Sequence, residues 1–80
     1  MPNKGAMINK LQMALASKGV QVTVNKKQFF SIVYEKVMTV YKIEERDRDG
    51  NKKLLIKTYK QAEVVQALAA RWKEAQNNGT

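Results

Sequence analysis

The sequence predicts an α+β protein, a two-layer sandwich with the order helix, three antiparallel strands, helix. Three observations predict it: apolar residues recur every three or four positions near both ends of the chain, they alternate with polar residues between, and a turn-forming run lies in the middle. The 80 residues leave room for one domain with one small core. We place this domain at residues 7–76, with 1–6 and 77–80 as disordered ends.

The first helix is predicted from Met7 onward. Gly19 ends it, because glycine adopts the left-handed conformation of a helix C-terminus without strain. The polar segment before Met7 contains the only proline and is left outside the fold. The apolar stripe of this helix consists of Met7, Ile8, Leu11, Ala14 and Leu15.

Two long strands are predicted next. Val20, Val22 and Val24 alternate with polar residues, and this strand either continues to Phe29 and Phe30 or stops and restarts there. A reversal over 31–36 leads to a second strand from Val37 to Arg46. Its alternation puts Val37, Thr39, Tyr41 and Ile43 on one side and Met38, Val40, Lys42 and Glu44 on the other.

The run from Asp47 to Asn51 predicts the turn of a β-hairpin over 37–59, with a third strand at Leu54, Leu55 and Ile56. The spacing of its acidic and amide side chains imitates the start of a calcium loop. However, Lys52 stands where that loop needs glycine, and Thr58 where it needs glutamate. We therefore interpret the run as a turn and expect no metal.

The second helix is predicted to begin at a capping box formed by Thr58 and Gln61. Its apolar face places Trp72 in the core, with an interface anchor as the alternative. That face consists of Ala62, Val65, Leu68, Ala69 and Trp72, widened by Val64.

The chain has no histidine and no cysteine. It therefore lacks the commonest general base near neutral pH, the usual soft metal ligands and the most reactive nucleophile. We expect a protein without enzymatic activity and without a cofactor. No disulfide can form and no apolar run approaches about 20 residues, so we expect a soluble cytoplasmic protein with no membrane partner.

The charge balance is strongly basic, with 15 Lys and Arg against 7 Asp and Glu and a net charge of +8. Such a charge attracts nucleic acid or an acidic protein, although surface lysine also serves solubility alone. We predict nucleic-acid binding through a lysine-rich surface. The candidate phosphate contacts are Lys26, Lys27, Lys52, Lys53 and Lys57.

The alternative function is a protein-interaction module. Two helices cover only one face of a three-stranded sheet, yet the strands have apolar residues on both sides. The open face would then bind another protein, for example a protein of a host cell that it modulates or inhibits. Alternatively, it would bind a second copy of the chain. The candidate interface residues are Phe30, Met38 and Val40.

The element order resembles that of the double-stranded RNA-binding domain. That family carries a histidine loop and a lysine-rich start of its last helix, of which this chain has only Lys57, Lys60 and Ala62. The family's RNA-contacting residues are therefore not carried over. The segment 28–41, with Gln28, Phe29, Phe30 and Ser31, and the later 64–68 resemble small phage and prophage proteins of Gram-positive bacteria. This resemblance implies a host cytoplasm and no mechanism.

Overall fold

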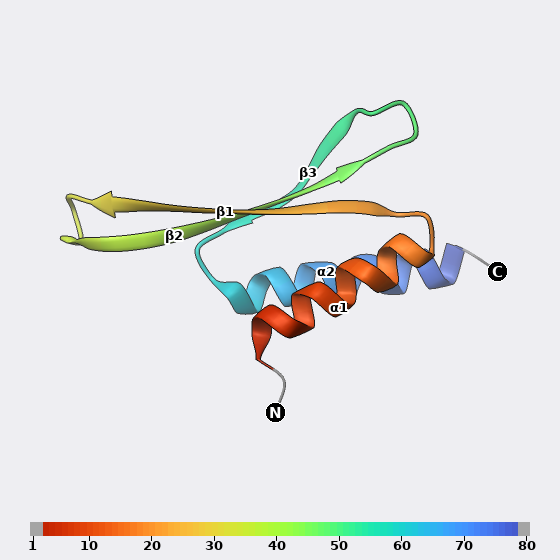
Figure 1. The fold of residues 1–80 in the computed structure, drawn as a ribbon, viewed down its shortest axis with the longest axis horizontal. Helices are drawn as coiled ribbons and strands as arrows, with labels where there is room; N and C mark the ends of the chain where they lie inside the picture. The colour runs from red at the N-terminus through yellow and green to blue at the C-terminus, as the bar shows by residue number, and fades with distance from the viewer. Residues whose placement is uncertain (1–2, 79–80) are drawn as a thin grey trace.

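The computed structural model describes residues 3–78 and contains a single antiparallel sheet with strand order β1-β2-β3. Both helices lie next to each other on one face of that sheet (Figure 1). The predicted α+β fold, with its order of helix, three strands, helix, is confirmed. The elements are α1 (Lys4–Ser17), β1 (Gln21–Ser31), β2 (Lys36–Arg46), β3 (Lys52–Thr58) and α2 (Gln61–Asn78).

Helix α1 begins three residues earlier than the apolar stripe predicts. The side chain of Asn3 accepts a hydrogen bond from the backbone N–H of Ala6 at 2.7 Å, and this N-cap extends the helix to Lys4. At the other end, Gly19 has the expected left-handed backbone, with φ of 82°. Helix α2 continues past the expected end of the domain at residue 76. Residues 1, 2, 79 and 80, expected to be disordered, lie outside the described part of the chain.

Strand β1 is continuous, which answers the question that the sequence left open. It pairs residue by residue with β2, from Gln21 opposite Arg46 to Ser31 opposite Lys36. Because no bulge interrupts this pairing, alternate residues keep to the same face along the whole of β1. The turn between the strands ends at Glu35, which takes a left-handed conformation with φ of 53°.

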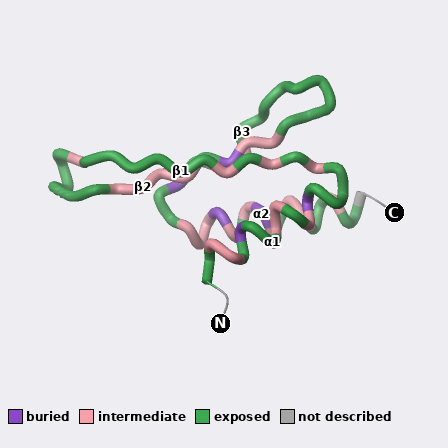
Figure 2. The backbone as a smooth tube through the Cα atoms, in the orientation of Figure 1, coloured by how far each residue is buried: buried purple, intermediate pink, exposed green. Residues whose placement is uncertain are grey.

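One face of the sheet, here called the covered face, packs on the helices. It includes Val22 and Val24 of β1 and Ile43 of β2. Leu15, Ile43, Val64 and Leu68 have no exposed surface and form the centre of the core together with Ile8 (Figure 2). Trp72 packs against this core, as predicted. The opposite side of the sheet, here called the open face, has no helix over it (Figure 1).

A β-bulge in β3 adjusts which residues reach the core. Ile56 lies opposite Ile43, but Leu54, and not Leu55, lies opposite Glu44. The extra residue allows both Leu55 and Ile56 to pack against the core. As a consequence, Leu54 lies on the open face and is 51% exposed.

Side chains fix the two connections that flank β3. A carboxylate oxygen of Asp47 accepts hydrogen bonds from the N–H groups of Asp49 and Asn51, both at 2.9 Å, as in a tight turn. The predicted capping box of Thr58 and Gln61 does not form, because α2 begins only at Gln61 and Thr58 precedes it as the last residue of β3. The buried Thr58 accepts a hydrogen bond from the N–H of Lys60 and donates a short one to the carboxylate of Glu63, two residues beyond Gln61.

The β1–β2 ribbon extends past β3 and past the helices as a free arm, here defined as residues 28–39 (Figure 1). Its residues are largely exposed, in contrast to the body of the domain (Figure 2). The arm stretches the molecule to 49 Å along its longest axis. It also raises the radius of gyration to 14.0 Å, against about 12 Å for a compact chain of this length.

Candidate nucleic-acid interface

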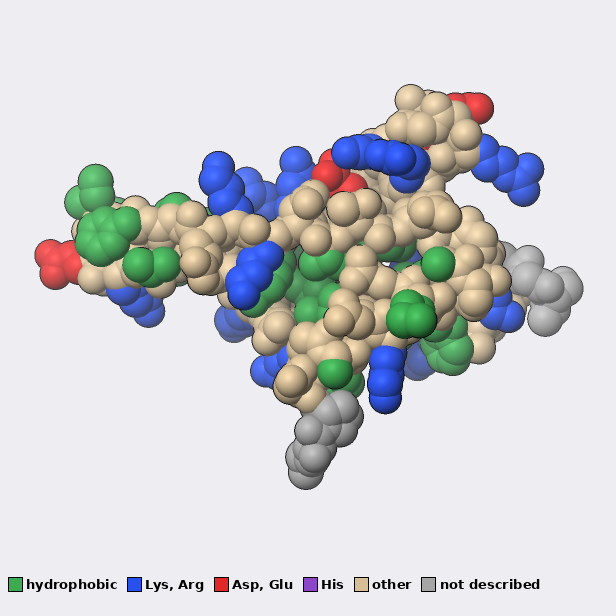
Figure 3. All heavy atoms as spheres, in the orientation of Figure 1, with side chains coloured by type: hydrophobic (Ala, Val, Ile, Leu, Met, Phe, Trp, Pro, Cys, Tyr) green, Lys and Arg blue, Asp and Glu red, His purple; other side chains and the backbone are tan. Residues whose placement is uncertain are grey.

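The open face of the sheet gathers positive charge from all three strands. Figure 3 shows Lys and Arg side chains along the side of the sheet away from the helices, and others around the helices. Among the described strand residues, Glu44 is the acidic side chain on the open face. By the register, the basic residues on this face are Lys27, Lys36, Lys42, Arg46, Lys52 and Lys57.

Two pairs of like charges stand directly opposite each other on this face. Lys42 of β2 faces Lys57 of β3, and Arg46 faces Lys52. Directly opposite side chains have Cβ atoms about 5 Å apart, so each pair is mutually repulsive and destabilises the sheet. Lys27 lies on the diagonal from Lys42, because the residue opposite Lys42 on β1 is Asn25. Glu44 lies between the two pairs and offsets part of the repulsion.

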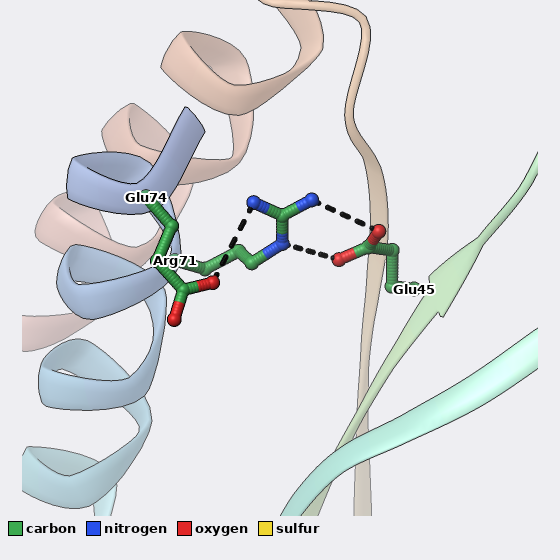
Figure 4. A network of polar contacts seen from close by, with 3 residues as sticks. All are labelled: Glu45, Arg71 and Glu74. Carbon is green, nitrogen blue, oxygen red and sulfur yellow. Dashed lines mark hydrogen bonds and ion pairs between the residues drawn. The ribbon is translucent and has the colours of Figure 1, made fainter. Parts of the chain in front are cut away.

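Two other acidic residues, Glu45 and Glu74, are engaged by Arg71 away from this surface. Arg71 of α2 forms a two-pronged contact with Glu45 of β2, at 2.6 and 3.1 Å, and approaches Glu74 at 3.8 Å (Figure 4). Glu45 belongs to the covered side of the sheet, where its cross-strand neighbour is Lys53. Within residues 3–78, every ion pair in the structure involves Arg71, and none involves a lysine of the open face.

The contact with Arg71 also sets the protonation of Glu45. The hydrogen bond from Arg71, followed by its positive charge and that of Lys53, lowers the pKa of the Glu45 carboxyl, and partial desolvation opposes this. The same hydrogen bond raises the pKa of Arg71. Glu45 on the covered side is therefore paired with a charge of opposite sign, whereas no lysine of the open face forms an ion pair within residues 3–78.

The five predicted phosphate contacts divide between the two sides of the sheet. Lys27, Lys52 and Lys57 share the open face. Lys26 lies opposite Tyr41 and Lys53 opposite Glu45, so both belong to the covered side, although both are exposed beyond the helices. The structure therefore brings three of the five together.

Sequence reasoning missed three members of the basic face. Lys42 was on the correct side of β2 by alternation, next to Val40, but was not selected. Arg46 and Lys36 follow from the same alternation, because both are an even number of residues from Lys42. The alternation alone could therefore have identified these three residues. The pairing of β2 with β3, which shows the residues that face them, could not be predicted from the sequence.

The three predicted interface residues are also divided. Met38 and Val40 lie on the open face and are half-buried. Phe30, expected next to them, lies on the opposite face, across from Val37, because the alternation of β1 runs unbroken from Val22. Phe29 takes its place on the open face, where its ring centroid is 6.3 Å from that of Tyr59. Aromatic rings beside lysines suit stacking on bases.

No protein-family model, curated protein or solved structure matches this chain. No helix of residues 3–78 is long and apolar enough to cross a membrane. No group of three or more acidic side chains in this part of the chain is arranged to hold a metal ion. Function must therefore be argued from the basic face itself.

Proposed function

We propose that this protein is a small non-enzymatic binding protein that contacts the phosphate backbone of nucleic acid with the open face of its sheet. The observation that supports this most directly is the like-charge pair of Lys42 and Lys57. Such a pair costs stability, and the one acid next to it, Glu44, is outnumbered by the basic residues Lys27, Arg46 and Lys52 on the same face. Polyanion binding is the interaction that such an arrangement favours.

The narrow shape of the face agrees with this proposal. The molecule measures only 15 Å along its shortest axis, which runs across the strands (Figure 1), and the basic side chains come from three adjacent strands. A face of this kind presents charges in rows, which can follow a phosphate backbone without reading base sequence. The exposed rings of Phe29 and Tyr59 next to Lys27 add a surface on which unpaired bases can stack.

Salt dependence of binding tests the proposal. Fluorescence anisotropy is measured with mixed-sequence duplex DNA, single-stranded DNA and RNA over a range of salt concentrations. If the face neutralises phosphates, the logarithm of the association constant falls linearly with the logarithm of salt for at least one of these ligands. Replacing Lys42→Gln and Lys57→Gln together is expected to reduce the slope for duplex DNA by about 1.8, or about 0.9 for each lost contact.

The matched control removes the same charge from the helices, with Lys10→Gln and Lys73→Gln, two exposed lysines away from the open face. This control should leave the slope nearly unchanged. Equal effects of the two double variants would show that net charge alone matters, and absence of binding at low salt would contradict the proposal.

The same assay separates the alternative of a protein-interaction module on the open face. Val40→Lys adds positive charge between Lys27 and the rest of the basic face. It should preserve or strengthen nucleic-acid binding, whereas it should disrupt an apolar protein interface centred on Met38 and Val40.

A further inference from the structure

The arm is apolar and electrically neutral, although the chain has a net charge of +8. Its charged residues are one acid, Glu35, and one base, Lys36. Ile32 and Val33 at its end are 84% and 83% exposed, and Figure 3 shows hydrophobic side chains gathered at this end of the molecule. The other large exposed apolar residues of the arm are Phe29, Phe30, Tyr34 and Val37. Positive charge is therefore concentrated outside the arm.

The arm is also a two-stranded ribbon without support. Strand β3 pairs with β2 only from Tyr41 onward, so β2 has an unpaired edge from Lys36 to Val40. An isolated two-stranded ribbon is marginally stable in water, and an unpaired edge rich in apolar residues readily accepts another strand. Between its ends this edge has no charged residue, proline or bulge that would block pairing.

We propose that two copies of this chain associate through their arms, with the edge Lys36 to Val40 of one copy pairing antiparallel with the same edge of the other. A two-fold axis at Met38 makes this edge self-complementary. It sets Met38 opposite Met38 of the second copy and Val37 opposite Thr39, and it sets Lys36 opposite the uncharged Val40. No like charges are directly opposite each other in this register; Lys36 lies on the diagonal from Lys42 of the second copy.

Charge is compatible with a second copy at the arm. Two bodies of charge +8 repel each other, and association through the neutral arm reduces this repulsion because the arm holds the bodies apart. The same register brings Glu35 of one copy to the level of Tyr41 of the other, at the end of its β3. The positively charged Lys57 and Lys60 flank this end, which places opposite charges next to each other.

The test is the mass of nuclease-treated protein, measured by sedimentation equilibrium between about 10 µM and 1 mM, a range that detects weak interfaces. The wild-type chain should shift with concentration from 9.1 kDa toward twice that mass. Met38→Lys and Met38→Glu each place two like charges across the axis, about 5 Å apart and thus within a Debye length at about 0.15 M salt. Each variant should weaken association at least about tenfold.

Mixing the two variants distinguishes lost pairing from a damaged arm. The mixture should form a heterodimer more tightly than either variant alone, because opposite charges then meet at the axis. Met13→Lys is the matched control, since Met13 is a methionine on α1 that is 73% exposed and far from the arm in the fold. It should leave association unchanged.

Three results would overturn the proposal. The first is a chain that stays monomeric at every concentration, and the second is a dimer that is insensitive to both Met38 variants. The third is a monomer that co-sediments with phosphatidylcholine vesicles, which would assign the apolar end of the arm to a membrane. Nucleic-acid binding by the open face does not enter this test, so either proposal can fail without the other.

Discussion

The two faces of the sheet contain charged residues of the same kinds but arrange them in opposite ways. On the covered side, Glu45 lies opposite Lys53 and contacts Arg71, so residues of opposite sign are brought together. On the open face, Lys42 lies opposite Lys57, so residues of the same sign are brought together. Charges near the core contribute to stability only when they are paired. Like charges in contact with water lower the free energy of unfolding only modestly, so they can lie together where a ligand binds. The difference separates the face that stabilises the fold from the face that we propose binds nucleic acid.

The largest expected effect concerns apolar packing on the two faces. Ile43 is fully buried against the helices, so Ile43→Ala should lower the free energy of unfolding by about 2 to 5 kcal/mol. Leu54→Ala on the open face should change it by no more than about 0.5 kcal/mol. Urea unfolding followed by circular dichroism measures both.

If Ile43→Ala does not fold, Ile43→Val provides the same comparison at about 0.5 to 1.5 kcal/mol. Similar losses for Ile43 and Leu54 variants would mean that the open face is also covered in solution.

The next effect concerns the paired charge. Glu45→Gln removes one partner of a contact that is about three-quarters shielded from water, and it should cost about 1 to 2 kcal/mol at neutral pH. Glu44→Gln on the open face is the matched control. It should cost less, and it should strengthen nucleic-acid binding because a carboxylate that repels phosphates is lost.

The pH dependence of stability follows from the same carboxyl. The folded pKa of Glu45 lies below 4.5, its ordinary value, so its contribution is complete above that pH. It is lost as the pH falls below 4.5 through the folded pKa, because protonation removes the charge that Arg71 contacts. Glu45→Gln should therefore flatten this part of the stability curve. An unchanged acid dependence would show that Glu45 is unpaired in solution.

The smallest effect has the opposite sign. Lys42→Gln removes the repulsion with Lys57 and should raise the free energy of unfolding by about 0.2 to 1 kcal/mol. The same variant should bind nucleic acid more weakly. A gain in stability together with a loss of binding would support the proposal that the open face binds nucleic acid and lowers the free energy of unfolding. A loss of stability would instead mean that the Lys42 side chain packs on the sheet through its methylene groups.

Much of the fold could be predicted from periodicity. The stripe containing Ile8 and Leu15 predicted α1, and the alternation of Val22 and Val24 predicted the covered face of β1. The start of α1 was missed, because an N-cap such as Asn3 acts through one hydrogen bond that leaves no periodic pattern. The bulge at Leu55 was missed for a related reason, since three successive apolar residues are compatible with either pairing of β3.

The candidate site was predictable only in part. Composition indicated a polyanion partner, and alternation put Lys42 on the same side as Val40. Phe30 was assigned to the wrong side because the sequence did not show that β1 continues without a break. Selecting lysines by their nearness along the chain grouped Lys52 with Lys53, whose side chains leave the strand in opposite directions.

By itself, the sequence determined the order of the elements, the apolar stripes that form the core and the excess of positive charge, because these depend on local spacing and composition. Only the tertiary structure decided which charges oppose each other and where the ribbon is left unsupported. Both depend on the pairing of strands that are distant in the chain. The seven residues of β3 cover only part of the eleven of β2, and this difference in length leaves the arm free.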